Sequence, residues 1–286
     1  MKIMILGASG MLGHAMARVL AARKTSDDLI LISRSLDIRS CFPELKGVHS
    51  KIGVDLENTD SLLEILTQFQ VNVVINCIGL VKQRRNAENP LYALPINTLL
   101  PHRLAHLCAL SATRLIHIST DCVFSGNKGN YNETDLSDAL DVYGKSKFLG
   151  EITAPHAITL RTSIIGHELR GGSQGLVGWF LSQSGSVRGF SRAIFSGLPT
   201  VELATIICEH ILPRAELSGV YHLAAAPISK LEFLQLVAHE YDIPIEIVAD
   251  DDLVIDRSLD ASRFTAATGY IAPDWPTLIR RMHRFG

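Results

Sequence analysis

Short apolar runs of strand length recur along the first half of the chain, separated by segments with helical periodicity. Runs that are apolar on both faces and alternate with helices favour a parallel sheet covered by helices. The expected strands are "KIMIL" (2–6), "LILIS" (29–33), "VNVVINCI" (71–78), "RLIHIS" (114–119) and "HAITLR" (156–161). The expected helices are approximately 11–23, 58–69, 97–112 and 139–153. We therefore predict an α/β fold with a Rossmann-type doubly wound parallel sheet.

The texture of the sequence changes after about residue 165. Glycine and serine become frequent among scattered arginine and aromatic residues, as expected of loops that shape a pocket. A β-α-β pattern then returns in "GVYHLAA", "ISKLEFLQLVAHEY" and "IEIVA". We predict a larger domain of residues 1–163 with about 193–226, and a smaller, mostly C-terminal lobe of about 164–192 and 227–286.

Composition narrows the function classes. A formal net charge of -2 with intermixed signs argues against nucleic acid as the main partner. The five cysteines are odd in number, widely spaced and contain no C-x-x-C pair, which disfavours a disulfide framework and a zinc knuckle. No stretch approaches the roughly 20 apolar residues of a spanning helix. We expect a cytoplasmic protein with a small-molecule partner, no membrane partner and no bound metal.

A glycine-rich segment, "LGASGMLG", follows the first expected strand and opens the first helix. It places Gly7, Gly10 and Gly13 where a dinucleotide fold needs a tight turn, close approach of the backbone to a pyrophosphate, and an open helix N-terminus. In isolation, the alternative explanation of these glycines is a turn with a helix packed closely on the sheet. The position at the first strand of a β-α series favours a dinucleotide cofactor.

The end of the second expected strand discriminates between two cofactors. An acid there would bind the ribose hydroxyls of NAD and repel the extra phosphate of NADP. Instead, "LILISRS" places Ser33 and Arg34 at that point, and the acids Asp27 and Asp28 precede the strand. NADP(H) is therefore favoured over NAD(H), although Arg34 is equally compatible with a solvated loop.

A tyrosine and a lysine lie four residues apart in "VYGKSKFLGE". On a helix, Tyr143 and Lys147 would share one face. An ammonium near a phenol lowers the phenol pKa from about 10 toward neutrality, where it exchanges a proton with a carbonyl or an alcohol. The alternative is a solvated helix face that carries an ordinary contact.

The chain resembles an extended short-chain dehydrogenase/reductase, specifically the dTDP-4-dehydrorhamnose reductase family of sugar-nucleotide reductases. The resemblance rests on an ordered series of motifs: "GASGMLG", "NCIG", "INTLLPHRLA", "STDCVFSG", "GNYNETD", "YGKSK", "LRTSIIG", "SGLPT" and "DRSLDASRF". It implies NADPH-dependent reduction of the 4-keto group of a nucleotide-diphospho-4-keto-6-deoxy sugar for cell-surface polysaccharide synthesis such as O-antigen. It also implies that the larger domain binds NADP and the smaller lobe binds substrate.

The same resemblance implies residue roles. Tyr143 would protonate the C4 carbonyl oxygen, Lys147 would hold the nicotinamide ribose and tune Tyr143, and Thr120 would hydrogen-bond the reacting oxygen. The cofactor-binding residues implied are Gly7, Ser9, Gly10, Met11, Leu12, Gly13, Ser33, Arg34, Asp55, Leu56, Asn76, Cys77, Ile78, Gly79, Tyr143 and Lys147. The substrate-side candidates are Asp121, Cys122, Ile164, Arg188, Arg257 and Arg263.

Two departures from the family concern the sugar. The family commonly has an aromatic residue at Cys122 and a tryptophan at Ile164, and the smaller side chains admit a different sugar, such as an N-acetylated one on UDP. Related dehydratases have a glutamate at position 122, which a thiol replaces poorly. We keep open a non-catalytic NADP-binding regulatory subunit and a sugar-nucleotide epimerase or dehydratase as alternatives, and a homodimer as an assembly.

Overall fold

The computed structural model describes residues 1–23, 28–81, 86–169 and 174–286, and the chain divides into two compact units. Unit 1 comprises Met1–Ser119, Asp141–Leu160 and Ala204–Val220; unit 2 comprises Thr120–Leu140, Arg161–Leu203 and Tyr221–Gly286. This division differs from the predicted boundaries at residues 120–140, and also at 161–163, 193–203 and 221–226. The segment 120–140 groups with the C-terminal part of the chain, because Asn130 N donates to Ser258 Oγ at 2.8 Å and Tyr131 N to Ser258 O at 2.9 Å.

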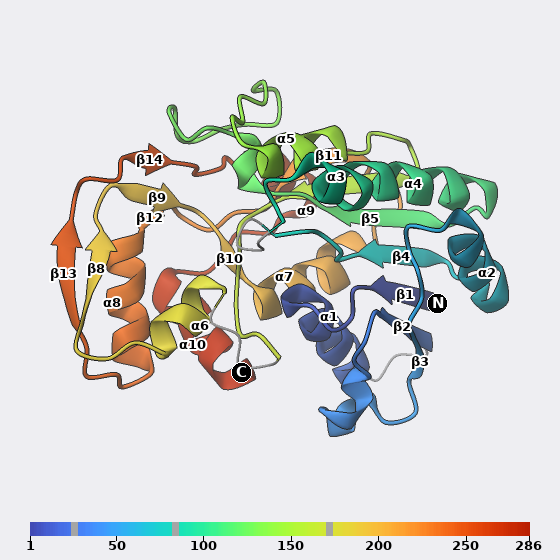
Figure 1. Cartoon of the computed structure of the whole chain (residues 1–286), viewed down its shortest axis with the longest axis horizontal. Coiled ribbons are helices and arrows are strands. Elements are labelled where there is room, and N and C mark those ends of the chain that lie inside the picture. Colours follow the sequence, from blue (N-terminus) through green and yellow to red (C-terminus); the bar gives the residue numbers. More distant parts are fainter. Residues whose placement is uncertain (24–27, 82–85, 170–173) are drawn as a thin grey trace. The chain divides into compact units, whose positions relative to one another are not determined.

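A seven-stranded sheet has the order β11-β6-β5-β4-β1-β2-β3 (Figure 1). From β6 to β3, neighbouring strands are parallel. The strands are β1 (Lys2–Leu6), β2 (Asp28–Ser33), β3 (His49–Ile52), β4 (Val73–Asn76), β5 (Arg114–Ile118), β6 (Ala157–Arg161) and β11 (Gly219–His222). The order reverses between β1 and β4, which is the point where doubly wound sheets bind ligands. The predicted fold class is confirmed.

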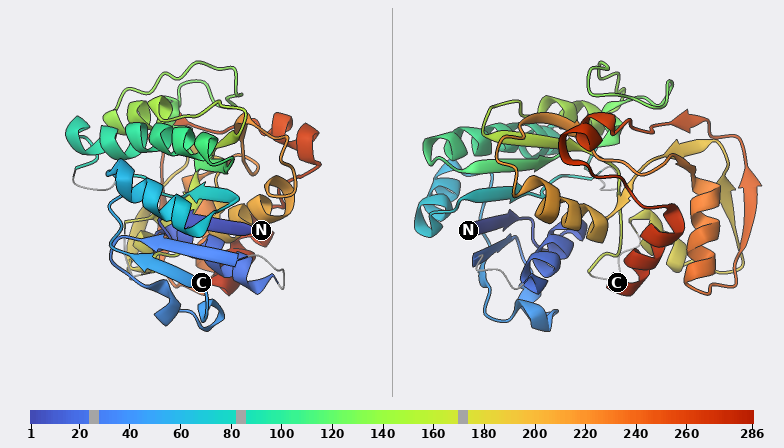
Figure 2. Two further views of the ribbon diagram at one scale, coloured as in Figure 1. Left: turned by 90° about the vertical axis from the view of Figure 1, so that its right-hand side faces the viewer. Right: turned by 180° about the vertical axis from the view of Figure 1, so that it is seen from behind.

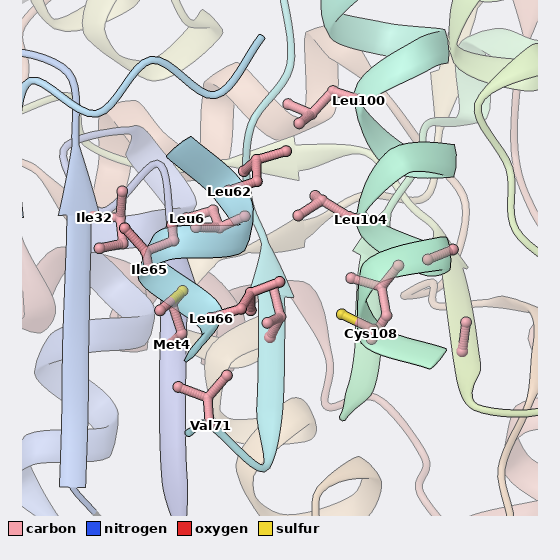
Figure 3. Packing of buried hydrophobic residues seen from close by; sticks show 14 of the residues in the cluster. Met4, Leu6, Ile32, Leu62, Ile65, Leu66, Val71, Leu100, Leu104 and Cys108 are labelled. Atoms are coloured by element: carbon pink, nitrogen blue, oxygen red, sulfur yellow. The ribbon is translucent and has the colours of Figure 1, made fainter. Parts of the chain in front are cut away.

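Helices cover both faces of this sheet. They are α1 (Met11–Ala22), α2 (Thr59–Phe69), α3 (Pro90–Leu94), α4 (Leu100–Leu110) and α5 (Val142–Leu149). The side chains of α2 and α4 bury Met4 and Leu6 of β1, together with Leu62 and Leu104, in one continuous apolar cluster (Figure 3). The helix α1 packs against β1 and β2 from the other face (Figure 2). Alternation along β1 thus gives each face its own core.

Two elements differ from the sequence-based expectation. The strand β3 was not predicted, because it is a short edge strand whose side chains are half-buried or exposed and carry no apolar run. The third helix begins at Pro90 rather than near residue 97, with Asn89 capping Leu91 N at 3.0 Å. It continues through a π turn at Pro95–Leu99 into α4, which accommodates the prolines that suggested a later start.

Unit 2 contains small sheets and helices around its own aromatic core. Its pairs are β7 (Ile164–Ile165) with β10 (Leu198–Pro199), β8 (Ser186–Phe190) with β13 (Glu246–Asp250), and β9 (Ala193–Phe195) with β12 (Ile228–Ser229) and β14 (Ile255–Asp256). Its helices are α6 (Leu176–Leu181), α8 (Lys230–Glu240), α9 (Ser262–Thr268) and α10 (Trp275–Phe285), and α7 (Thr200–Ile206) begins in it. Phe195, Phe233 and Trp275 pack with ring centroids 5.5 to 5.7 Å apart.

Candidate active site

The turn after β1 requires glycine at two positions. Gly7 has a φ of +79°, and the N–H groups of Gly7 and Ala8 both donate to Ile32 O at 3.0 Å. A Cβ on Gly13 would lie 2.1 Å from Gly7 O, so only glycine lets α1 approach the turn this closely. The glycine motif therefore fixes the start of α1 against the carboxyl end of β1.

The first turn of α1 suits an anionic group. Its N-cap is Gly10, no side chain caps it, and the first turn has no acidic residue. Ser9 and Met11 are half-buried beside it and Leu12 is buried. Free N–H groups and the positive end of the helix dipole favour negative charge at such a terminus. The turn therefore fits the pyrophosphate of a dinucleotide.

The carboxyl end of β4 borders this turn. Asn76 Oδ1 accepts from Ile78 N at 3.1 Å, and Asn76 Nδ2 donates to Nδ1 of the buried His117 at 3.1 Å. A Cβ on Gly7 would lie 2.9 Å from Ile78 Cγ1 and 3.3 Å from the Cys77 carbonyl. Residues 76–79 therefore lie against the glycine turn where the strand order reverses, as expected for a cofactor segment.

The end of β2 carries Ser33 and Arg34, as the sequence suggested. Ser33 is buried and its hydroxyl donates to Leu36 O at 2.6 Å, whereas Arg34 is exposed. Asp28 lies at the opposite end of β2, and Asp27 lies outside the described residues. Asp37, an acid a few residues beyond the strand, was not among the residues predicted from the sequence. Arg39 hydrogen-bonds both oxygens of Asp37 at 2.6 to 3.0 Å and holds the pKa of this carboxyl below its usual value.

Asp55 and Leu56 lie in the loop after β3. The carboxylate of Asp55 is exposed and accepts from Glu57 N at 3.0 Å, which makes it a turn residue in this structure. Leu56 is half-buried and packs against the apolar cluster that contains Leu62 and Leu104. These two residues share unit 1 with the glycine turn, and their contact with adenine remains a prediction.

The helix α5 carries Tyr143 and Lys147 one turn apart. Asp141 caps this helix by accepting from Gly144 N at 2.7 Å. Lys147 is 4% exposed, and its Nζ donates to Ile118 O at the end of β5 at 2.6 Å. Burial lowers the lysine pKa to about 8, while Glu151 and Cys77 act in the opposite direction. Tyr143 is half-buried. A titratable cation thus lies beside the strand end, within one helical turn of a phenol.

The sequence analysis also missed Asn97, which lies in the π turn and is 1% exposed. Its Oδ1 accepts from Leu80 N at 2.8 Å, and its Nδ2 donates to Leu80 O at 3.2 Å and to Ser146 Oγ at 3.1 Å. Asn97 therefore fixes the chain just beyond Gly79 to the helix that carries Tyr143 and Lys147. The signal was present in "INTLLPHRLA", where a buried polar residue interrupts an apolar helix pattern.

Thr120, Asp121 and Cys122 form a short helical turn in unit 2. Thr120 is its N-cap, with Oγ1 accepting from Cys122 N at 3.2 Å and donating to Asp121 Oδ1 at 3.1 Å. Burial raises the pKa of Asp121, and Arg257 opposes this shift. Burial and the neighbouring Asp121 raise the pKa of the Cys122 thiol to about 12. The thiol is therefore protonated at neutral pH and is neither a nucleophile nor a substitute for a catalytic carboxylate.

The other substrate-side candidates occupy different parts of unit 2. Arg257 is half-buried and its Nε donates to Phe124 O at 2.8 Å, which ties it to the Thr120–Cys122 turn. Ile164 is half-buried in β7, and Arg263 stacks on Tyr221 with its Cζ 4.6 Å from the ring centroid. Arg188 is 71% exposed and pairs with Asp250 at 2.9 Å. Of these three arginines, Arg257 is the one that hydrogen-bonds to the residue at the end of the Thr120–Cys122 turn, Phe124.

Two features are absent from the described part of the chain. There, no group of three or more His, Cys, Asp or Glu side chains is placed to hold a metal ion. None of its helices is both long and apolar enough to cross a membrane.

Comparison with known proteins places this site in a family. The model of the RmlD substrate binding domain matches residues 1–252. A probable low-salt glycan biosynthesis reductase Agl14 from Haloferax volcanii is 28% identical over 91% of this chain and 85% of its own. The dTDP-4-dehydrorhamnose reductase of Aggregatibacter actinomycetemcomitans is 32% identical, but the match covers 57% of this chain and 51% of that protein. The methionine adenosyltransferase 2 subunit beta of Danio rerio is 25% identical over 85% of this chain and 75% of its own.

Solved structures agree on the fold. A hypothetical dTDP-4-dehydrorhamnose reductase from Sulfolobus tokodaii superposes with a TM-score of 0.77 at 25% identity, over 96% of this chain and 98% of that one. The dTDP-4-dehydrorhamnose reductase of Bacillus anthracis, solved with NADP, gives 0.79 at 18% identity over 100% and 99%. On the match over most of its length, the chain belongs to the RmlD substrate binding domain family, as the resemblance predicted.

Proposed function

We propose that the chain is an NADPH-dependent reductase of the 4-keto group of a nucleotide-diphospho-4-keto-6-deoxy sugar. The observation that carries the proposal is the buried Lys147 at the end of β5, one helical turn from Tyr143. Family membership and the 32% identical dTDP-4-dehydrorhamnose reductase support the same chemistry. Among the described residues, no group of side chains is placed to hold a metal ion, and the pKa of the Cys122 thiol is raised, so neither metal nor thiol chemistry has comparable support.

The residues of unit 1 suit NADP(H). The glycine turn would bind the pyrophosphate, and Arg34 would pair with the 2′-phosphate, since Arg39 already neutralises Asp37. Residues 76–79 would line the cofactor, with Lys147 on the nicotinamide ribose. The bound cofactor supplies the hydride that ketone reduction requires.

The protein residues manage the proton. Tyr143 would donate its phenolic proton to the carbonyl oxygen as negative charge develops there, and the Lys147 ammonium would stabilise the resulting phenolate. Thr120 would donate a hydrogen bond to the same oxygen, which requires its hydroxyl to exchange its present partner Asp121.

The exact sugar is part of the proposal. The sugar is dTDP-4-dehydrorhamnose or a UDP-linked N-acetylated analogue in this proposal. The smaller side chains of Cys122 and Ile164 would admit the analogue, and Arg257 is the first candidate for a polar substrate contact. We place the reaction in the cytoplasm, in synthesis of a cell-surface polysaccharide, and leave a homodimer as the proposed assembly.

Two alternatives are not favoured. A non-catalytic subunit, as the similarity to a methionine adenosyltransferase beta subunit suggests, has no need for a buried lysine beside a tyrosine. A dehydratase needs an acid where this chain has Cys122, whose thiol keeps its proton.

Loss of NADPH absorbance with a panel of dTDP- and UDP-4-keto-6-deoxy sugars tests the proposal. Turnover is expected with at least one sugar, and Tyr143→Phe should lower it roughly 10²- to 10⁴-fold while NADPH still binds. No turnover with any of them would reject the reductase, and tight NADPH binding in that case would favour the regulatory subunit. Product formation without NADPH consumption would favour the epimerase.

A further inference from the structure

Two side chains at the end of α5 reach two successive residues at the carboxyl end of β5. Lys147 Nζ donates to the carbonyl oxygen of Ile118 at 2.6 Å, and Ser119 Oγ donates to Glu151 Oε1 at 2.7 Å. Lys147 lies in the last turn of α5, and Glu151 lies two residues beyond the end of this helix, where its N–H donates to Phe148 O at 3.1 Å. At the carboxyl end of β5, the carbonyl of Ile118 is therefore bound by Lys147, and the hydroxyl of Ser119 by Glu151.

The other titratable groups that act on Lys147 carry no charge at neutral pH. Cys77, from the end of β4, is a thiol whose pKa burial raises to about 12. His117, from β5, is fully buried, and burial, Lys147 and His102 lower its pKa well below the usual value. Tyr143 precedes Lys147 by one turn of α5 and is the phenol on which the ammonium acts in the proposed function. Glu151 is the remaining group whose charge favours the ammonium.

We propose that Glu151, fastened by Ser119, is a positioning residue that keeps the Lys147 ammonium charged and fixed at the carboxyl end of β5. The proposal deepens the proposed function and rests on its assignment of Lys147 to the cofactor ribose. Glu151 touches neither cofactor nor substrate in this scheme. It acts through Lys147, because a buried ammonium without a facing carboxylate loses its proton more readily.

The proposal predicts a shift on the pH axis. The pKa of Lys147 is about 8, so NADPH should bind more weakly as the pH rises through that value. Removing the negative charge of Glu151 lowers this pKa, and the weakening should begin at lower pH. A shift of roughly one pH unit is the scale expected for a nearby opposite charge.

The experiment measures the NADPH dissociation constant by fluorescence from pH 6 to 9.5 in the full chain. Glu151→Gln keeps the size of the side chain without its charge and should move the alkaline midpoint down by roughly one unit. Glu151→Asp should stay near the native midpoint, and Ser119→Ala, which frees the carboxylate, should give a smaller shift in the same direction. Glu64→Gln is the matched control, since Glu64 is 67% exposed and pairs with Lys51, and it should change nothing.

A native midpoint in Glu151→Gln would overturn the proposal, even if that variant melted at lower temperature, because a merely structural role moves stability and not the pH midpoint. If Glu151→Gln does not fold, Ser119→Ala decides, and an unshifted midpoint there would also overturn it. Native-like NADPH binding with the expected shifts but without sugar turnover would uphold Glu151 and reject the reductase. Absence of NADPH binding to the native chain would overturn both.

Discussion

Each compact unit buries a histidine beside a cation. In unit 1, His117 lies near Lys147, and in unit 2, His222 lies 3.3 Å from Arg161, measured from Nε2 to Nη1. Burial is the main cause that lowers the pKa of both histidines, and the neighbouring cation adds to it. In both pairs the pKa of the histidine is lowered, but the neighbouring cation is a lysine in unit 1 and an arginine in unit 2.

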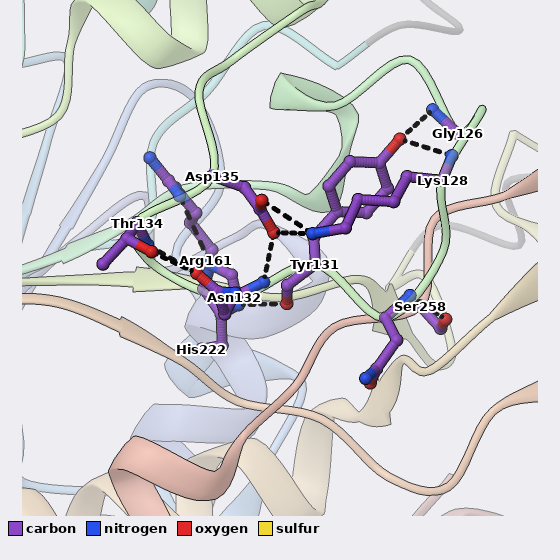
Figure 4. Close-up of polar contacts among 10 residues, drawn as sticks. Gly126, Lys128, Tyr131, Asn132, Thr134, Asp135, Arg161, His222 and Ser258 are labelled. Carbon is purple, nitrogen blue, oxygen red and sulfur yellow. Dashed lines mark hydrogen bonds and ion pairs between the residues drawn. The ribbon is translucent and has the colours of Figure 1, made fainter.

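The type of cation matches the role of each pair: Arg161 belongs to a structural network, and Lys147 to the proposed active site. The guanidinium of Arg161 lies with its Cζ 5.1 Å from the ring centroid of Phe124 and donates to His222, whose Nδ1 then donates to Tyr131 O. Tyr131 in turn accepts from Gly126 N and Lys128 N, so the network fixes the loop after the Thr120–Cys122 turn (Figure 4). Lys147 instead titrates near pH 8. The planar guanidinium of Arg161 suits a fixed hydrogen-bond network, whereas the compact ammonium of Lys147 suits stabilisation of the charge that develops on Tyr143 in the proposed reaction.

Replacing Lys147 of unit 1 by arginine should have the largest effect, which is a loss of turnover. Lys147→Arg keeps the charge but replaces a compact, buried ammonium that donates to Ile118 O with a larger planar fork of different geometry. We expect turnover to fall roughly 10²- to 10³-fold. Steady-state kinetics with the best sugar of the panel measure it, and Lys145→Arg on the exposed side of α5 is the control. Native turnover in Lys147→Arg would erase the distinction between the two units.

Lowering the pH should destabilise the protein through protonation of His222 in unit 2. The pKa of His222 is about 4 in the folded protein, against 6.5 when unfolded, so its contribution is complete above pH 6.5 and lost as the pH falls toward 4. The loss amounts to about 3 kcal/mol by pH 4. Urea unfolding at several pH values measures it, and His222→Gln should flatten this part of the acid slope. His117 contributes with the same sign, so a slope unchanged by His222→Gln would assign acid sensitivity to unit 1 instead.

Removing the cation of unit 2 should affect stability rather than proton transfer. Arg161→Met fills similar space but leaves Nε2 of the buried His222 without its donor, at a cost of about 2 kcal/mol in the free energy of unfolding. Urea unfolding at pH 7.5 measures this cost. Arg188→Met, at a position 71% exposed, should cost under about 0.5 kcal/mol. Equal costs would mean that the buried network does not hold unit 2.

The sequence predicted unit 1 better than unit 2 for a physical reason. The glycine turn and the Tyr143–Lys147 pair are local motifs, in which spacing along the chain fixes spacing in the fold. Arg257 reaches Phe124 O across 133 positions of the chain, and Asn97 reaches Ser146 across 49, so neither contact has a local signature. The edge strand β3 was missed because its residues lack the apolar run by which buried strands are recognised.

The smallest effect is expected at Cys122, which tests whether unit 2 contributes any thiol chemistry. With a pKa of about 12, this thiol stays protonated, so Cys122→Ser should keep turnover within about threefold and change mainly the KM for the sugar. Mass spectrometry after iodoacetamide treatment at pH 8 should find the exposed Cys41 alkylated well before Cys122. Rapid labelling of Cys122 with parallel loss of activity would place a reactive group in unit 2. A reactive Cys122 would mean that unit 2 also contains a group that changes its charge near neutral pH, as Lys147 does in unit 1. A thiolate at Cys122 would need a stabilising cation, and Arg257 would be the group to examine.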